Sequence, residues 1–233
     1  MTETRFTTAL IVGAGAGLSA SLARVLSKEG IKVALAARST DDLHDLAVEA
    51  GAETFACDAA KRSEVDELFN NLDATIGAPE IVIYNASYRT RGPFAELDPA
   101  EVEKSIAVTA FGAFLVAQQA VKRMLPKGRG VILFTGASAG VKGYAQSAPF
   151  AMGKFALRGL SQSMARELHP QGIHVAHVVI DGGIKSARRA EPADKPASLL
   201  DPAAIAASYL HLIHQPHSVW SAELELRPWV EKF

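Results

Sequence analysis

The sequence has one cysteine, almost no net charge and no long apolar run, and each shortage excludes a class of protein. Cys57 has no partner for an internal disulfide, so the fold must hold without one. The formal net charge of −1 leaves no basic footprint for nucleic acid. No apolar run reaches the ~18 residues of a membrane span, and Met1–Phe6 shows no signal-peptide pattern. We expect a soluble cytoplasmic protein that binds neither nucleic acid nor membrane.

What the chain does have is the composition of an ordinary globular domain. Hydrophobic residues make up 48% of the 233 residues and charged residues 21%. A chain of this length can bury a sizeable core within one unit. We therefore predict a single domain that spans residues 1–233.

Short apolar runs alternate with segments of helical periodicity along the chain. The runs predict strands at Thr8–Val12, Lys32–Ala37, Glu53–Cys57, Ile81–Tyr84, Val131–Phe134, Ile173–Ile180 and Ser221–Leu226. Helices are predicted between them, at Leu18 to Gly30, Asp41–Ala50, Ser63 to Leu72, Asp98 to Met124, Phe150 to His169 and Asp201 to Pro216. This alternation, with strands apolar throughout, predicts an α/β fold with a doubly wound parallel sheet. Lys185–Leu200 departs from the pattern and is expected to be a mobile surface segment.

Small or polar residues follow each of the first six predicted strands, where open parallel sheets bind ligands. These residues are Gly13 to Gly17, Arg38, Asp58, Asn85-Ala86-Ser87, Ser138 and Asp181-Gly182-Gly183. The glycine segment between a strand and a helix favours a phosphate, although a tight turn would use the same residues. Arg38 suits a 2′-phosphate, which favours NADP over NAD, or is simply exposed. Asp58 either accepts a hydrogen bond from an adenine or caps a loop.

Phe150 and Lys154 lie four residues apart in a predicted helix, so they share one face of it. Lys154 can donate a proton if burial lowers its pKa. Ser138 is a second candidate for chemistry, or a turn residue. Tyr88 and Tyr144 lie in loops that we expect to border the same crevice.

The chain resembles the short-chain dehydrogenase/reductase family, whose members have a Rossmann fold, over essentially its whole length. The resemblance is carried by Gly13 and Gly17 of the glycine loop, with Ser19 in place of the last glycine, by Asp58, by Asn85-Ala86-Ser87, by Lys154 of the Tyr-x-x-x-Lys pair, and by Asp181-Gly182 with Ser186. It implies an oxidoreductase that uses NADP, with NAD as the other possibility, on a small carbonyl or alcohol substrate. It also implies a homodimer or homotetramer through the two long central helices.

The resemblance implies the following site. Cofactor binding falls to Gly13, Gly15, Ala16, Gly17, Leu18, Arg38, Asp58, Asn85, Ala86, Ser87, Lys154, Gly182, Ile184 and Ser186, and catalysis to Lys154 and Ser138. Phe150 occupies the position of the family's catalytic tyrosine, Ala137 that of its serine, and Thr109 that of its asparagine. A positioned general acid contributes roughly 10²–10⁴-fold to a rate, and phenylalanine supplies none of it.

Three functions follow from this pattern. The first is an NADP-preferring oxidoreductase with a different proton donor. The second is a catalytically silent dinucleotide-binding or sensor protein, and the third is a subunit that completes an oligomer, to which Trp220 and Trp229 could contribute. His211, His214 and His217 recur every three residues, but Pro216 interrupts them, so we expect no metal site.

Overall fold

Within residues 6–231, the part of the chain that the computed structural model describes, seven parallel strands form one sheet. The strands are β1 (Thr8–Val12), β2 (Lys32–Ala37), β3 (Glu53–Ala56), β4 (Ile81–Tyr84), β5 (Gly130–Thr135), β6 (Ile173–Ile180) and β7 (Glu223–Leu226). Their order across the sheet is β3-β2-β1-β4-β5-β6-β7. The strand order thus reverses between β1 and β4, which confirms the doubly wound sheet predicted from the sequence.

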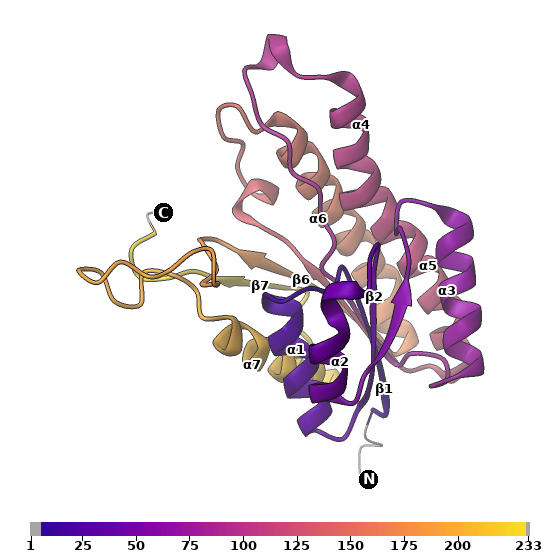
Figure 1. Ribbon diagram of the computed structural model, residues 1–233. Helices are drawn as coiled ribbons and strands as arrows, with labels where there is room; N and C mark the ends of the chain where they lie inside the picture. The colour runs from indigo at the N-terminus through magenta and orange to yellow at the C-terminus, as the bar shows by residue number, and fades with distance from the viewer. Residues whose placement is uncertain (1–5, 232–233) are drawn as a thin grey trace.

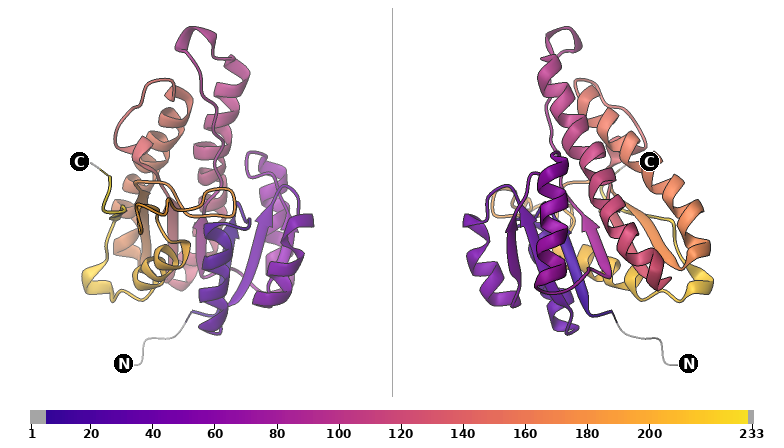
Figure 2. Two further views of the ribbon diagram at one scale, coloured as in Figure 1. Left: turned by 60° about the vertical axis from the view of Figure 1, so that its left-hand side comes forward. Right: turned by 90° about the vertical axis from the view of Figure 1, so that its right-hand side faces the viewer.

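Helices cover both faces of this sheet (Figure 1; Figure 2). One face carries α1 (Leu18–Lys28), α2 (His44–Ala50) and α7 (Pro202–Ile213). The other carries α3 (Arg62–Ala74), α5 (Gly112–Met124) and α6 (Ala148–Leu168), and α4 (Pro99–Ile106) extends from α5 beyond the sheet beside α6. In the described part of the chain, no helix is both long enough and apolar enough to cross a membrane.

The central strands are apolar on both sides because both sides are buried. In β1, Leu10 faces the α3–α5–α6 layer and its neighbour Ile11 faces the α1–α7 layer, and neither is exposed. Each fully buried side chain of this size contributes roughly 1.5–3 kcal/mol. Cys57 is buried as well, and desolvation raises the pKa of its thiol to about 12, which suits a small core residue.

The predicted helix from Asp98 to Met124 contains an interruption that the sequence pattern did not indicate. Residues Ala107–Phe111 form a π-helical segment between α4 and α5. The buried Tyr84 of β4 donates its hydroxyl to the carbonyl oxygen of Val108. At Gly112 a Cβ would lie 2.6 Å from that hydroxyl, so only glycine fits there. The wider turn makes room for the tyrosine, and π-helical insertions are frequent at functional sites.

The ends of three strands also differ from those predicted. β5 runs from Gly130 to Thr135 and is one residue longer at each end than predicted. β3 ends at Ala56, one residue before Cys57. β7 begins at Glu223, two residues later than predicted, because Ser221 is hydrogen-bonded to Gln215 instead of the sheet. The backbone N–H of Ser221 donates to Oε1 of Gln215, and Nε2 of Gln215 donates to the hydroxyl of Ser221.

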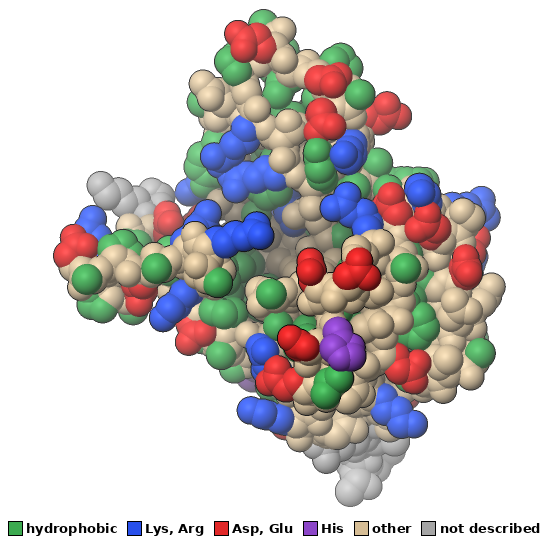
Figure 3. Space-filling view, viewed as in Figure 1, with side chains coloured by type: hydrophobic (Ala, Val, Ile, Leu, Met, Phe, Trp, Pro, Cys, Tyr) green, Lys and Arg blue, Asp and Glu red, His purple; other side chains and the backbone are tan. Residues whose placement is uncertain are grey.

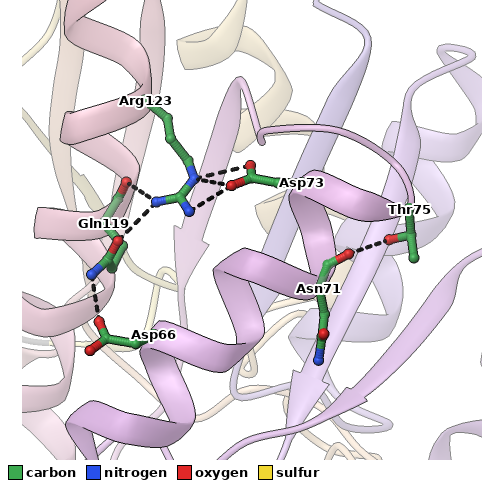
Figure 4. Close-up of polar contacts among 6 residues, drawn as sticks. All are labelled: Asp66, Asn71, Asp73, Thr75, Gln119 and Arg123. Carbon is green, nitrogen blue, oxygen red and sulfur yellow. Dashed lines mark hydrogen bonds and ion pairs between the residues drawn. The ribbon is translucent and has the colours of Figure 1, made fainter.

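A polar clasp joins α3 to α5 on the outside of the sheet (Figure 4). Arg123 reaches the carboxylate of Asp73 at 2.6 Å and also donates to Gln119, whose amide donates to Asp66. The guanidinium of Arg123 lies 5.0 Å from the centre of the Phe69 ring. The clasp fixes the layer that carries the π-helical segment.

Candidate active site

The carboxyl ends of β1, β4, β5 and β6 border one cavity of about 790 Å³, a size typical of small-molecule sites. It is lined by the predicted site residues Gly17, Leu18, Asn85, Ser87, Ser138, Lys154, Gly182, Ile184 and Ser186. The predicted residues Gly13, Gly15, Ala16, Arg38, Asp58 and Ala86 lie outside this lining. The sheet therefore brings together residues that are far apart in the sequence, at the edge where the sequence placed them.

The glycine loop between β1 and α1 has the shape of an anion site. Gly13 has a φ of +84°, and a Cβ there would lie 2.4 Å from the backbone nitrogen of Ala86. At Gly15 and Gly17 a Cβ would meet no described atom within 4 Å, so space is open in front of the loop. Among the described residues, no side chain caps the α1 N-terminus that follows Gly17. The first N–H groups of α1 are thus available to a phosphate.

Ser19 links this loop to β4, which sequence reasoning missed. Its hydroxyl donates to the carbonyl oxygen of Gly13 at 3.0 Å and accepts from Nδ2 of Asn85 at 2.7 Å. Ser19 is buried, so these contacts hold the two strand ends in register. The only signal in the sequence was a serine in place of a glycine.

Arg38 and Asp58 follow β2 and β3, at the end of the sheet away from Lys154. Arg38 is exposed, and no described residue forms an ion pair with it. Asp58 accepts from the N–H of Ala60 at 3.1 Å, and its own N–H donates to Glu64 at 2.7 Å. One carboxylate oxygen of Asp58 thus closes a turn before α3, as the loop interpretation of this residue requires.

Lys154 and Asp181 are the two most deeply buried charged residues of the cavity lining. Lys154 lies on α6, is 3% exposed, and its Nζ donates to the carbonyl oxygen of Thr135 at 2.7 Å. Burial lowers the pKa of Lys154 to about 8, because desolvation disfavours the ammonium. A lysine poised in this way can exchange a proton near neutral pH, which an exposed lysine does rarely.

Phe150 lies one helical turn before Lys154 and is flanked by two cations. The ammonium of Lys154 is 5.8 Å from the centre of its ring, and the guanidinium of Arg89 is 4.9 Å from it. Ser138 and Tyr144 also line the cavity. The loop that carries Tyr88 borders the cavity, as predicted, through Ser87 and Arg89. Tyr88 itself is not part of the lining, and its hydroxyl donates to Glu101 of α4.

The buried ring of His177 packs beneath Gly136, which lines the cavity. A Cβ at Gly136 would lie 2.3 Å from Nε2 of this buried histidine, so the chain passes directly over its ring. Its Nδ1 lies 3.2 Å from Glu223, yet burial dominates and lowers its pKa to about 4. His177 is therefore neutral at physiological pH. Within the described residues, no three His, Cys, Asp or Glu side chains gather in a way that could hold a metal.

The segment after β6 closes one side of the cavity. Ile184 bridges to Leu200, and Ser186 pairs with Arg189 through both backbone N–H groups. Trp229 donates its indole N–H to the carbonyl oxygen of Pro196. Backbone hydrogen bonds thus fold the predicted surface segment back on itself, and the indole of Trp229 links it to the part of the chain after β7.

A glycine-bearing strand–helix turn at the switch point of a doubly wound sheet defines a dinucleotide-binding class of protein. The family model for short chain dehydrogenase matches residues 7–196, and the chain belongs to this family.

Relatives extend the match over nearly the whole chain. An uncharacterized oxidoreductase of Staphylococcus aureus (strain N315) is 29% identical over 226 residues, which cover 94% of this chain and 96% of the relative. A short-chain dehydrogenase structure from Rhodopseudomonas palustris is 33% identical, with a TM-score of 0.83 over 97% of this chain and 100% of that one. A metagenomic short-chain oxidoreductase in complex with NADP is 27% identical, with a TM-score of 0.83 over 96% and 98%.

Proposed function

We propose that the protein is an NADP-preferring oxidoreductase that interconverts a small carbonyl compound and its alcohol. The observation that carries this proposal is the buried Lys154, which faces the cavity with a pKa of about 8. The family membership and the relative solved with NADP support the cofactor. When bound, the nicotinamide would supply or accept the hydride.

The residues present suit such a dinucleotide. The open space at Gly15 and Gly17 and the uncapped start of α1 suit its diphosphate, with Ala16 and Leu18 completing the loop. Further residues are assigned to the rest of the cofactor: Arg38 to a 2′-phosphate, Asp58 to the adenine, Asn85, Ala86 and Ser87 to the strand end, Lys154 to the ribose, and Gly182, Ile184 and Ser186 to the nicotinamide side.

Lys154 also takes the role of proton donor in this proposal. Phe150 stands where the family resemblance places a tyrosine, and its ring has no proton to give. During reduction, Nζ of Lys154 passes a proton to the carbonyl oxygen of the substrate, which becomes a hydroxyl. Ser138, which follows the carboxyl end of β5, donates a hydrogen bond to the same oxygen and holds it in place. The lysine then regains its proton from water.

The phenyl ring of Phe150 also favours a second candidate, a protein that binds the dinucleotide without turnover.

Exposed apolar side chains on the outer faces of α5 and α6 and on the segment between α4 and α5 suit an oligomer in either case. They are Phe111, Phe114, Met152 and Phe155. Trp220 does not join them, because its ring stacks on His174 at 4.9 Å within the same chain. A homodimer or homotetramer remains our proposal.

Titration with NADPH and NADH, followed by cofactor fluorescence, tests the cofactor assignment. We expect both to bind and NADPH to bind more tightly. Failure of both cofactors to bind would refute both candidate functions. Turnover of carbonyl compounds by the wild-type protein then separates the enzyme from the silent binder.

A further inference from the structure

Unpaired cations concentrate around the cavity. Arg89, Arg91, Lys185, Arg188 and Arg189 line it, and none of them forms an ion pair with a described residue. The lining contains two acidic side chains, Glu231 and Asp181, and Asp181 is paired with Arg227 at 3.5 Å. Figure 3 shows Lys and Arg side chains along the upper and left borders of the hollow, with acidic groups below it. Like charges repel when they gather, so this arrangement favours an anionic occupant.

The cofactor accounts for only part of this charge. Lys185, Arg188 and Arg189 belong to the segment that carries Ser186, which we assign to the dinucleotide. The phosphates of that dinucleotide can neutralise them. Arg89 and Arg91 come instead from the loop after β4, beside Phe150 and α6. Their charges are left for another ligand.

The loop that carries these two arginines is anchored at both ends. Before Arg89, the N–H of Tyr88 donates to Thr109 at 3.2 Å, and Ser105 donates to the carbonyl oxygen of Tyr88 at 3.0 Å. After Arg91, the N–H of Gly92 donates to the carbonyl oxygen of Gln146 at 3.1 Å. Thr109 lies in the π-helical segment, so that irregular turn helps to aim the loop. The arginines thus start from a fixed backbone, which reduces the entropic cost of binding.

The guanidinium of Arg89 lies in the part of the cavity that contains Phe150 and Lys154. It lies over the Phe150 ring at 4.9 Å, and Lys154 reaches the same ring at 5.8 Å. Both cations therefore border the same side chain within the cavity. The phenyl ring serves as the platform on which the guanidinium rests.

We propose that the substrate is a short carbonyl compound bearing a carboxylate or phosphate, which Arg89 and Arg91 bind while its carbonyl faces Lys154. The proposal rests on the proposed function for the carbonyl end and on the arginine pair for the anionic end. Guanidinium groups bind carboxylate and phosphate oxygens through paired hydrogen bonds, which fixes orientation as well as charge.

Matched ligand pairs test this proposal on the full chain saturated with NADPH. Calorimetry compares levulinate with methyl levulinate, and dihydroxyacetone phosphate with dihydroxyacetone. We expect the dissociation constant of at least one anion to be lower than that of its neutral partner by about tenfold or more. We expect Arg89→Leu and Arg91→Leu each to remove about tenfold of that preference while NADPH affinity stays unchanged. The two pairs separate a carboxylate site from a phosphate site.

Arg166→Leu is the matched control, because Arg166 is exposed on α6 roughly 24 Å along the helix from Phe150. It should alter neither affinity. Equal binding of charged and neutral partners, no anion binding, or loss of NADPH affinity in Arg89→Leu would each overturn the proposal. If NADPH itself does not bind, the proposed function fails, and the same ligand pairs on the free protein still decide whether the arginines form an anion site.

Discussion

The ammonium of Lys154 donates to the carbonyl oxygen of Thr135 across 2.7 Å, from the first half of α6 to the end of β5. This bond joins the helix that carries Phe150 to the strand that leads to Ser138. Its acceptor is a neutral carbonyl, so no carboxylate compensates the desolvation of the lysine, and the pKa of Lys154 falls to about 8. The structure thereby places a titratable proton at the cavity without a hydroxyl at position 150.

Removal of the Lys154 ammonium should lower the rate of carbonyl reduction more than it lowers the affinity for NADPH. In the proposed mechanism, Lys154→Met loses the proton donor, and we expect the rate of carbonyl reduction to fall roughly 10²-fold or more. NADPH affinity should weaken by a smaller factor, since the ribose loses one partner. Stopped-flow absorbance of NADPH measures both. Lys127→Met, at an exposed lysine after α5, is the control. A rate unchanged by Lys154→Met would remove Lys154 from the mechanism.

The lowered pKa of Lys154 also predicts how stability depends on pH. Between a pKa of about 8 in the folded chain and 10.5 in the unfolded chain, the unfolded state binds the extra proton. Stability therefore rises as pH increases through this window, by up to about 3 kcal/mol if 1.36 kcal/mol applies per pKa unit. Urea unfolding at several pH values should show this rise in the wild type and lose it in Lys154→Met. Equal slopes in both proteins would contradict the assignment.

Arg38 is expected to determine cofactor preference. It is exposed and has no described ion-pair partner, so it is available to a 2′-phosphate. Arg38→Asp should weaken NADPH by about tenfold and improve NADH, because a carboxylate repels the phosphate and accepts from a ribose hydroxyl. Fluorescence titration of the two cofactors provides the ratio, with Arg62→Asp on α3 as a control. An unchanged ratio would show that another group reads the ribose.

Gly13 should tolerate no side chain. A Cβ there meets the backbone of Ala86 at 2.4 Å, and the φ of +84° is strained for any L residue with a side chain. Gly13→Ala is therefore expected to lower the free energy of unfolding by about 2 kcal/mol or more. The Cβ of Gly15→Ala meets open space, so the free energy of unfolding of this variant should lie within about 1 kcal/mol of the wild-type value. Denaturant unfolding of the two variants compares them directly, and similar losses would argue against the close approach.

The sequence was sufficient where burial alone determines structure. β2, β4 and β6 begin and end where predicted, because their apolar runs are covered on both faces. The π-helical segment was not predicted, since it depends on the hydroxyl of Tyr84 from a distant strand. Neither the Ser19 bridge to Asn85 nor the stacking of Arg89 on Phe150 has a local signature. Such contacts follow from loop positions that only the assembled sheet determines.

Carbonyl reduction by the wild type and by Phe150→Tyr tests the central claim most directly. With NADPH saturating and the matched anionic and neutral carbonyl pairs as substrates, the account predicts measurable NADPH oxidation by the wild type. It also predicts that the rate decreases as pH rises through about 8, where Lys154 loses its proton. Phe150→Tyr should change that pH profile because a second donor enters the site. Tight NADPH binding with no turnover by the wild type, together with turnover created by Phe150→Tyr, would contradict the account and identify a silent dinucleotide-binding protein.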